Sequence, residues 1–172
     1  MVARDARTGE IPADDPLAAA CDGEPRWLSG PEQEAWKAAA LLMLQLPGPL
    51  DNQLRRDSGI TLFEYLVLSF LSMAPGDRMR MSELARLANG SLSRLSNVVK
   101  RLEDRGWVSR AADPEDGRYT VARLTPSGRR LVTAAAPGHA RAVRQLLIDP
   151  LTTAQLRVLA DIGQRLQATI GC

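Results

Sequence analysis

Apolar residues recur at helical spacing in the first third of the chain. Pro31 stands at a favoured first helical position, and Ser29-Gly30 precedes it. The apolar residues that follow with a helical period are Ala35, Trp36, Ala39, Leu42, Met43 and Leu46. This pattern predicts a helix over 31–46. Pro47-Gly48-Pro49 interrupts it, and residues 50–56 can resume a short helical turn.

The middle of the chain carries start and stop signals for three more helices. Thr61-Leu62-Phe63-Glu64 is a capping box that predicts a helix over 62–73. Ser82 is expected to cap a short helix over 83–88, and Asn89-Gly90-Ser91 forms the turn to a helix over about 92–105. We expect the buried face of that last helix to consist of Leu92, Leu95, Val98, Val99 and Leu102.

Two short strands and two helices complete the pattern. Residues 107–111 and 119–124 alternate as strands around a charged loop over 113–118, which predicts a hairpin. Thr125-Pro126 begins a helix that reaches about residue 148, with a kink or break at Pro137-Gly138, and a box at 152–155 opens a last helix to about 169. The expected fold is mainly α, with a winged helix-turn-helix lobe, a small β-hairpin wing, and terminal helices outside the lobe.

Charge is unevenly distributed in this chain of 172 residues, although its net charge is only +2. Residues 78–130 carry twelve basic and six acidic side chains, whereas residues 1–30 carry three arginines and six acids. A basic middle third is typical of a surface that binds a polyanion such as nucleic acid. A solvated surface rich in arginine is the alternative interpretation.

Several classes of function lack a basis in the sequence. The longest apolar run, over 38–44, is far shorter than the roughly 20 residues that cross a bilayer. One histidine and two cysteines provide no metal-ligand pattern, and no phosphate loop or nucleophile motif occurs. We therefore expect no membrane span, no metal or cofactor and no enzymatic activity. The low cysteine content favours a cytoplasmic protein without disulfides.

The order of elements from residue 82 to 124 is that of a winged helix-turn-helix. A recognition helix must bury one face on its own lobe and present small donors and arginines to the major groove. Asn97 can pair with adenine, and Arg94 or Arg101 can bind guanine or phosphate. Arg118, held near its turn by Asp116, can enter the adjacent minor groove.

Three segments together resemble the multiple antibiotic resistance regulator (MarR) family of bacterial transcription regulators. They are Met81-Ser82-Glu83-Leu84-Ala85, the run from Arg101 to Arg110, and Asp116-Gly117-Arg118 followed by Leu124-Thr125 and Gly128. The resemblance covers about residues 31–170. It implies a homodimer that binds a pseudo-palindromic operator in double-stranded DNA, usually as a repressor released by a small ligand or an oxidant.

The resemblance also assigns roles to individual residues. Bases would be read from the start of the recognition helix, by Ser91, Ser93, Arg94, Ser96 and Asn97. Arg101 and Ser82 suit phosphates, Arg118 matches the wing arginine, and Asp116 matches the carboxylate that orients it. The alternatives are that Asp116 only forms a turn and that Ser96 is an ordinary surface serine.

The departures from the family pattern suggest where an effector could bind. Pro47-Gly48-Pro49 and Pro137-Gly138 would border the effector cleft of the family, and that cleft could be lined by Trp36, Met43, Phe63 and Tyr65. The simpler interpretation is that these four are core residues. Likewise, His139 is either a pH- or metal-responsive group or a structural residue.

Two functional alternatives and a domain division complete the expectations. The winged helix could serve as a protein-interaction module without DNA binding, or Cys21 or Cys172 could make the regulator redox-responsive. We expect a flexible arm over 1–30, a dimerisation helix over 31–60, a DNA-binding lobe over 61–125 and C-terminal dimerisation helices over 126–172.

Overall fold

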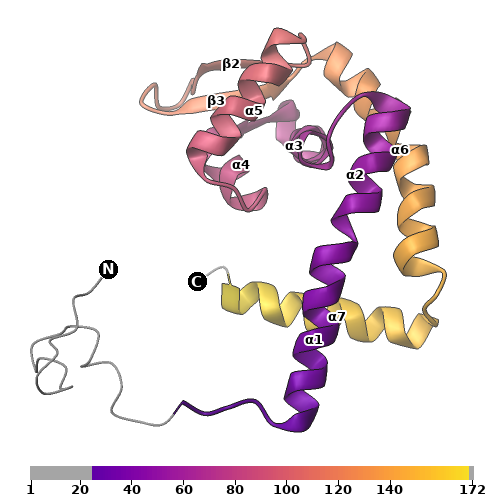
Figure 1. The fold of residues 1–172 in the computed structure, drawn as a ribbon. Helices are drawn as coiled ribbons and strands as arrows, with labels where there is room; N and C mark the ends of the chain where they lie inside the picture. The colour runs from indigo at the N-terminus through magenta and orange to yellow at the C-terminus, as the bar shows by residue number, and fades with distance from the viewer. Residues whose placement is uncertain (1–24, 171–172) are drawn as a thin grey trace, which may run out of the picture. The chain divides into compact units, whose positions relative to one another are not determined.

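A computed structural model of the protein describes residues 25–170. Most of the predicted arm, together with Cys21 and Cys172, lies outside the described residues. The helices are α1 (Gly30–Gln45), α2 (Pro47–Ser58), α3 (Leu62–Met73), α4 (Met81–Leu87), α5 (Leu92–Asp104), α6 (Pro126–Val143) and α7 (Thr153–Ile170), with short helical segments η2 (Pro75–Asp77) and η3 (Arg144–Ile148). Figure 1 shows their order along the chain. The mainly α fold expected from the sequence is confirmed.

The chain divides into two compact units, and the division falls after Ala40, inside α1. The fold below belongs to the second unit, which holds α2 to α7 and the sheet. Within α1, whose residues are all described, no side chain is buried. The sequence-based domain boundaries stay a prediction.

The predicted capping box at the start of α3 is confirmed. The Thr61 hydroxyl accepts a hydrogen bond from the Glu64 amide at 3.1 Å, and the Glu64 carboxylate accepts one from the Thr61 amide at 2.8 Å. The two residues thereby satisfy two amides that the first helical turn leaves without partners. The helix begins at Leu62 because this reciprocal pair forms there.

The turn between α4 and α5 follows from Asn89-Gly90-Ser91, as predicted. Asn89 has a φ of 47° and Gly90 donates to the Ala85 carbonyl at 3.0 Å, which is the hydrogen-bond pattern of a Schellman turn. The Ser91 hydroxyl then caps α5 by accepting a bond from the Arg94 amide. The prediction that Ser82 caps α4 was wrong, because the N-cap residue of α4 is Arg80, two residues earlier, and no side chain caps this helix.

The sheet has three antiparallel strands rather than the two of the predicted hairpin. β2 (Val108–Ala112) and β3 (Thr120–Leu124) form the wing hairpin, and β1 (Arg78–Arg80) pairs with the other edge of β3, where Arg80 lies opposite Val121. A strand of three residues has too short an alternation to be recognised in the sequence. Its pairing places the start of α4 beside the base of the wing.

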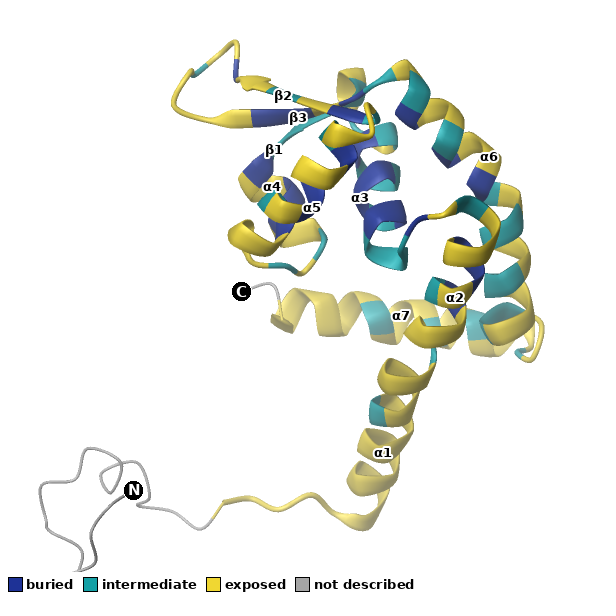
Figure 2. Cartoon of the chain, turned by 45° about the horizontal axis from the view of Figure 1, so that its top comes forward, coloured by how far each residue is buried: buried dark blue, intermediate teal, exposed yellow. Residues whose placement is uncertain are grey.

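The core of the lobe forms around α3, which Figure 2 shows as the most deeply buried helix. The largest side chains with almost no solvent exposure are Leu54, Ile60, Leu68, Leu71, Leu84, Leu95 and Leu102. Leu95, Val98, Val99 and Leu102 of α5 are buried as predicted. Leu92 was assigned wrongly to that face; it is 54% exposed, because the first residue of α5 projects beyond the lobe.

The predicted interruption at Pro137-Gly138 does not break α6, which runs from Pro126 through Pro137 to Val143. The departure from α-helical hydrogen bonding comes later, in η3, where five residues form a π-helical turn. The capping box predicted before α7 is confirmed, because Gln155 and Thr152 exchange hydrogen bonds. α7 also has no buried residue among its described positions.

Candidate nucleic-acid interface

The exposed face of α5 carries most of the side chains predicted to read bases. Ser93, Arg94, Asn97 and Arg101 are exposed, and Ser96 is half-buried. Ser91 belongs to the same surface, but its hydroxyl accepts the capping bond from the Arg94 amide at 3.2 Å and lies 3.1 Å from the Ser93 hydroxyl. Because the leucines and valines on the other side of α5 are buried in the core, this polar face is directed toward solvent.

Two arginines of α5 contact residues of α3, and these contacts were not predicted from the sequence. The Arg94 guanidinium lies 4.8 Å from the centre of the Phe63 ring, a cation–π contact. The Arg101 Nε lies 3.5 Å from Glu64 Oε1, and the Glu64 side chain is only 7% exposed. Glu64 therefore closes the capping box and also anchors one side chain of the predicted DNA-binding face.

These contacts could not be seen in the sequence because each joins residues more than thirty positions apart. Gly90 contributes to the same arrangement, since a Cβ at this position would lie 3.3 Å from Cζ of the Phe63 ring. The α4–α5 turn thus approaches the ring closely on the side of the lobe that carries Arg94. Ser82, the predicted phosphate ligand on α4, is exposed in the first turn of that helix.

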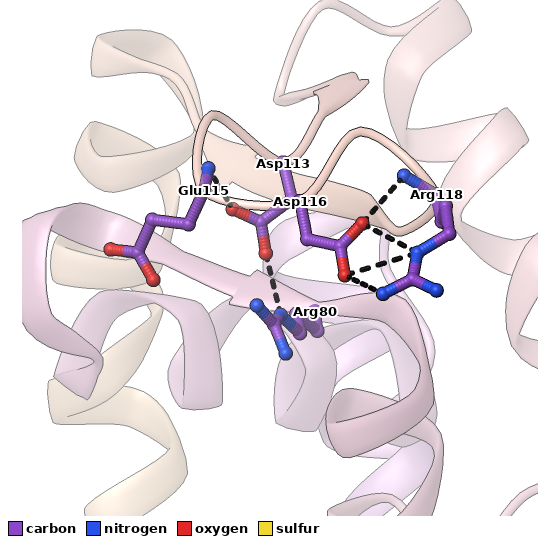
Figure 3. Close-up of polar contacts among 5 residues, drawn as sticks. All are labelled: Arg80, Asp113, Glu115, Asp116 and Arg118. Carbon is purple, nitrogen blue, oxygen red and sulfur yellow. Dashed lines mark hydrogen bonds and ion pairs between the residues drawn. The ribbon is translucent and has the colours of Figure 1, made fainter.

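The wing loop holds Arg118 by a two-pronged ion pair with Asp116. Arg118 Nε donates to Asp116 Oδ1 at 2.9 Å and Nη2 donates to Oδ2 at 2.6 Å, while the Arg118 amide donates to the same carboxylate at 3.2 Å. Figure 3 shows both side chains at the end of the hairpin. The Arg118 side chain is 84% exposed. Asp116 therefore orients an arginine whose outer face is open to solvent.

The charges of this pair stabilise each other. The hydrogen bonds from the Arg118 guanidinium, and then from its amide, lower the pKa of the Asp116 carboxyl below its ordinary value. Asp116 in turn raises the pKa of Arg118. Both groups are therefore charged at neutral pH, and the arginine retains donors that point away from Asp116.

The junction that follows the wing explains the spacing of Leu124-Thr125 and Gly128. The Thr125 hydroxyl donates to the Gly106 carbonyl at 2.7 Å and accepts from the Gly128 amide at 3.1 Å, while the Thr125 amide donates to the Trp107 carbonyl at 3.0 Å. A Cβ on Gly128 would lie 2.8 Å from Leu124 Cδ1 and 3.0 Å from the Trp107 carbonyl carbon. The start of α6 is therefore hydrogen-bonded to the turn between α5 and β2.

The four candidate effector residues lie in different surroundings. The Tyr65 ring is buried against His139, with 4.5 Å between ring centres, whereas Phe63 contacts Arg94 on another side of α3. Residues two positions apart on a helix do not share a face. Trp36 and Met43 of α1 are 59% and 60% exposed, so neither is a core residue of the single chain.

The described residues offer neither a membrane-spanning helix nor a metal site. Among the described residues, no helix has the length and apolar character that a transmembrane segment requires. Residues 25–170 also contain no group of three His, Cys, Asp or Glu side chains arranged to hold a metal ion.

The helix pair α4–α5, the antiparallel hairpin and the arginine at its end define a winged helix-turn-helix protein. Comparison with known proteins identifies its kind. Residues 58–118 match the family model described as MarR family. The HTH-type transcriptional repressor Rv2887 of Mycobacterium tuberculosis is 37% identical over 108 residues, which span 63% of this chain and 76% of the relative.

Two solved structures from Streptomyces coelicolor agree with this match. The MarR family transcriptional regulator Sco3205, solved in complex with DNA, is 42% identical with a TM-score of 0.78, over 83% of this chain and 89% of that one. The MarR family regulator AbsC is 35% identical with a TM-score of 0.74, over 83% and 99% of the two chains. The chain therefore belongs to the MarR family of transcriptional regulators.

Proposed function

We propose that the protein is a homodimeric transcriptional repressor that binds a pseudo-palindromic DNA operator and is released by a small ligand. The observation that carries the proposal is the joint presentation of the polar face of α5 and the oriented Arg118 of the wing. Helix and wing side chains of this kind suit the major groove and the adjacent minor groove. The basic charge of residues 78–130 supports the same partner.

The roles within this interface are proposed residue by residue. Asn97, Ser93, Ser96 and Arg94 read base edges, and Ser91 shapes the helix start that carries them. Arg101 and Ser82 bind phosphates. Arg118 enters the minor groove while Asp116 fixes its orientation. The DNA-bound relative Sco3205, at 42% identity, supports DNA as the partner.

The proposed homodimer would cover apolar side chains that the single chain leaves exposed. On α7 these are Val158, Ile162, Leu166 and Ile170, and on α1 they include Trp36, Leu42 and Met43. Exposed apolar stripes of this length are unusual in a monomer, and a second copy of the chain is the partner the family implies. We therefore propose residues 31–60 and 126–172 as dimerisation segments flanking a lobe over 61–125, with residues 1–30 as an arm.

Repression, the effector and the cellular location belong to the proposal as well. Three curated relatives at 37% identity are named repressors, which supports the sign of regulation. Trp36, Met43, Phe63 and Tyr65 are the positions to replace one at a time in a test of effector response. A regulator of bacterial operators acts in the cytoplasm.

The test is operator binding by the Arg118→Ala variant. The operator is an inverted repeat sought upstream of the gene for this protein, with half-sites about one helical turn apart. We expect Arg118→Ala to weaken binding about tenfold or more, and log affinity to fall linearly with log salt concentration. Fluorescence anisotropy of labelled duplex at several salt concentrations measures both.

The matched control is Arg144→Ala. Arg144 is also an exposed arginine held by a nearby aspartate, with 2.7 Å to Asp149, but it lies in η3 outside the lobe. Because Arg144 lies within a proposed dimerisation segment, gel filtration must show that the variant is still a dimer; we then expect it to bind the operator as the wild type does. Salt-independent binding, or equal loss in the two variants, would contradict the proposed interface.

A further inference from the structure

Arg80 contacts both residues that bound the wing loop. Its Nε donates a hydrogen bond to Asp113 Oδ2 at 2.5 Å, and its guanidinium carbon lies 4.6 Å from the centre of the Tyr119 ring. Asp113 directly follows β2, and Tyr119 directly precedes β3. One side chain therefore joins the two ends of the loop, as Figure 3 shows for its contact with Asp113.

The contacts of Asp113 extend into the loop itself. Its amide donates to the Tyr119 carbonyl at 2.9 Å, and its Oδ1 accepts the Glu115 amide at 3.0 Å. The Asp113 side chain is only 8% exposed, so its charge is stabilised by these donors rather than by water. The bond from the Glu115 amide and then the one from Arg80 lower the pKa of Asp113.

The rest of the loop continues this chain of contacts to the wing arginine. The Tyr119 amide donates to the Asp116 carbonyl at 3.0 Å, and the Asp116 carboxylate holds Arg118. The conformation of the loop at Tyr119 thus sets the position of Asp116. A change at the base of the loop is expected to reach Arg118 through this short hydrogen-bonded path.

Arg80 also belongs to the helix-turn-helix. It is the last residue of β1 and the N-cap residue of α4, with an extended backbone at φ −62° and ψ 140°. Its side chain therefore connects the base of the wing to the residue at which the helix pair α4–α5 begins. No other hydrogen bond or ion pair between described side chains joins the wing loop over 113–119 to β1.

We propose that Arg80 is a positioning residue for DNA binding, which fixes the wing relative to the recognition helix so that Arg118 and α5 reach adjacent grooves together. The role rests on the proposed DNA-binding function. Arg80 acts through Asp113 and Tyr119 and does not itself contact DNA.

The first arm of the test uses the protein without DNA. Hydrogen exchange of the amides of Glu115, Arg118 and Tyr119, measured by NMR in the full-length protein, reports the order of the wing loop. We expect Arg80→Gln to speed their exchange by about tenfold while the amides of α3 stay protected. Asp113→Asn keeps an acceptor for Glu115 but weakens the charge pair, and we expect the same direction of change. Unchanged exchange in both variants overturns the proposal.

The second arm is a double-mutant cycle on operator affinity. Arg80→Gln should weaken binding about fivefold in the wild-type background and less than about twofold in the Arg118→Ala background, because its effect passes through Arg118. Arg78→Gln is the control: Arg78 lies two positions earlier on β1 and carries the same charge, but among the described residues its side chain makes no hydrogen bond or ion pair with the wing loop over 113–119, and it acts on Asp113 only through its charge. Its effect should be equal in both backgrounds.

The outcomes separate this inference from the function on which it rests. If Arg80→Gln weakens binding equally in both backgrounds, Arg80 is a direct phosphate ligand and the positioning role is wrong. If the wild-type protein binds no operator while Arg80→Gln still speeds amide exchange in the loop, the DNA-binding proposal fails. The contacts of Arg80 with Asp113 and Tyr119 are then structural contacts that order the wing loop. A circular-dichroism melt of each variant confirms that the lobe is folded.

Discussion

Replacing Gly128 by alanine should destabilise the lobe strongly, although alanine is the better helix former. Gly128 lies in the first turn of α6, and a Cβ there would be 2.8 Å from Leu124 Cδ1 and 3.0 Å from the Trp107 carbonyl carbon, with the carbonyl oxygen closer still. The Trp107 carbonyl belongs to the backbone and accepts the Thr125 amide at 3.0 Å. It cannot move aside without breaking that bond.

The expected magnitude follows from three contributions. Alanine gains about 1 kcal/mol over glycine in a helix. Forcing a methyl group into filled space costs up to about 3 kcal/mol, and loss of the bond between Thr125 and Trp107 costs about 1 kcal/mol more. We therefore expect Gly128→Ala to lower the free energy of unfolding by about 3 kcal/mol.

The assay is urea unfolding followed by circular dichroism at one fixed protein concentration, since dimerisation would couple stability to concentration. Gly163→Ala is the matched control, because Gly163 lies within α7 and a Cβ there would meet no atom within 4 Å outside its own stretch of helix. The same substitution should stabilise by up to about 1 kcal/mol at that site. If Gly128→Ala is as stable as the wild type, the close packing between the α5–β2 turn and α6 is wrong.

Three further outcomes are expected. Thr61→Ala should cost about 1 kcal/mol in urea unfolding, because it removes the hydroxyl that caps α3; an unchanged midpoint would contradict the cap. Glu64→Gln should lower operator affinity several-fold in anisotropy titrations, because it removes the ion pair that anchors Arg101, and stronger binding would indicate that Glu64 competes with phosphate for Arg101 instead. Burial lowers the pKa of the His139 imidazole below its ordinary value, so the unfolded chain binds more protons and the free energy of unfolding should fall as the pH decreases below about 6.5. Since His139 is the only histidine, His139→Gln should reduce this slope in unfolding measurements at several pH values.

The sequence predicted the elements whose causes are local. Thr61 and Glu64 mark the start of α3, and Asn89 with Gly90 marks the end of α4, because the groups that form each cap lie within six residues of one another. A break of α6 at Pro137 was among the expectations because a proline inside a helical pattern usually ends the helix, whereas α6 continues past it to Val143. The strand β1 was missed because it exists only through pairing with β3, more than forty residues later.

The contacts of the candidate DNA-binding site also divide into local ones, which could be predicted from the sequence, and ones between distant residues, which could not. Asp116 and Arg118 are two positions apart, so their pairing could be expected from the sequence and is present in the structure. The contacts of Arg94 with Phe63 and of Arg101 with Glu64 depend on how α5 packs across α3. Helical periodicity gives the face on which a side chain lies, but it gives no information about which distant residue that face meets.

The attachment of β1 to the wing has a consequence for protein engineering. Because β3 pairs with β1 on one edge and with β2 on the other, the hairpin over 108–124 is not a self-contained part. A chimaera that exchanged only this hairpin with that of a relative would separate Arg80 from Asp113 and Tyr119. A chimaera designed to transfer DNA preference between such proteins should therefore exchange a segment that begins before Arg78, so that all three strands come from the same protein.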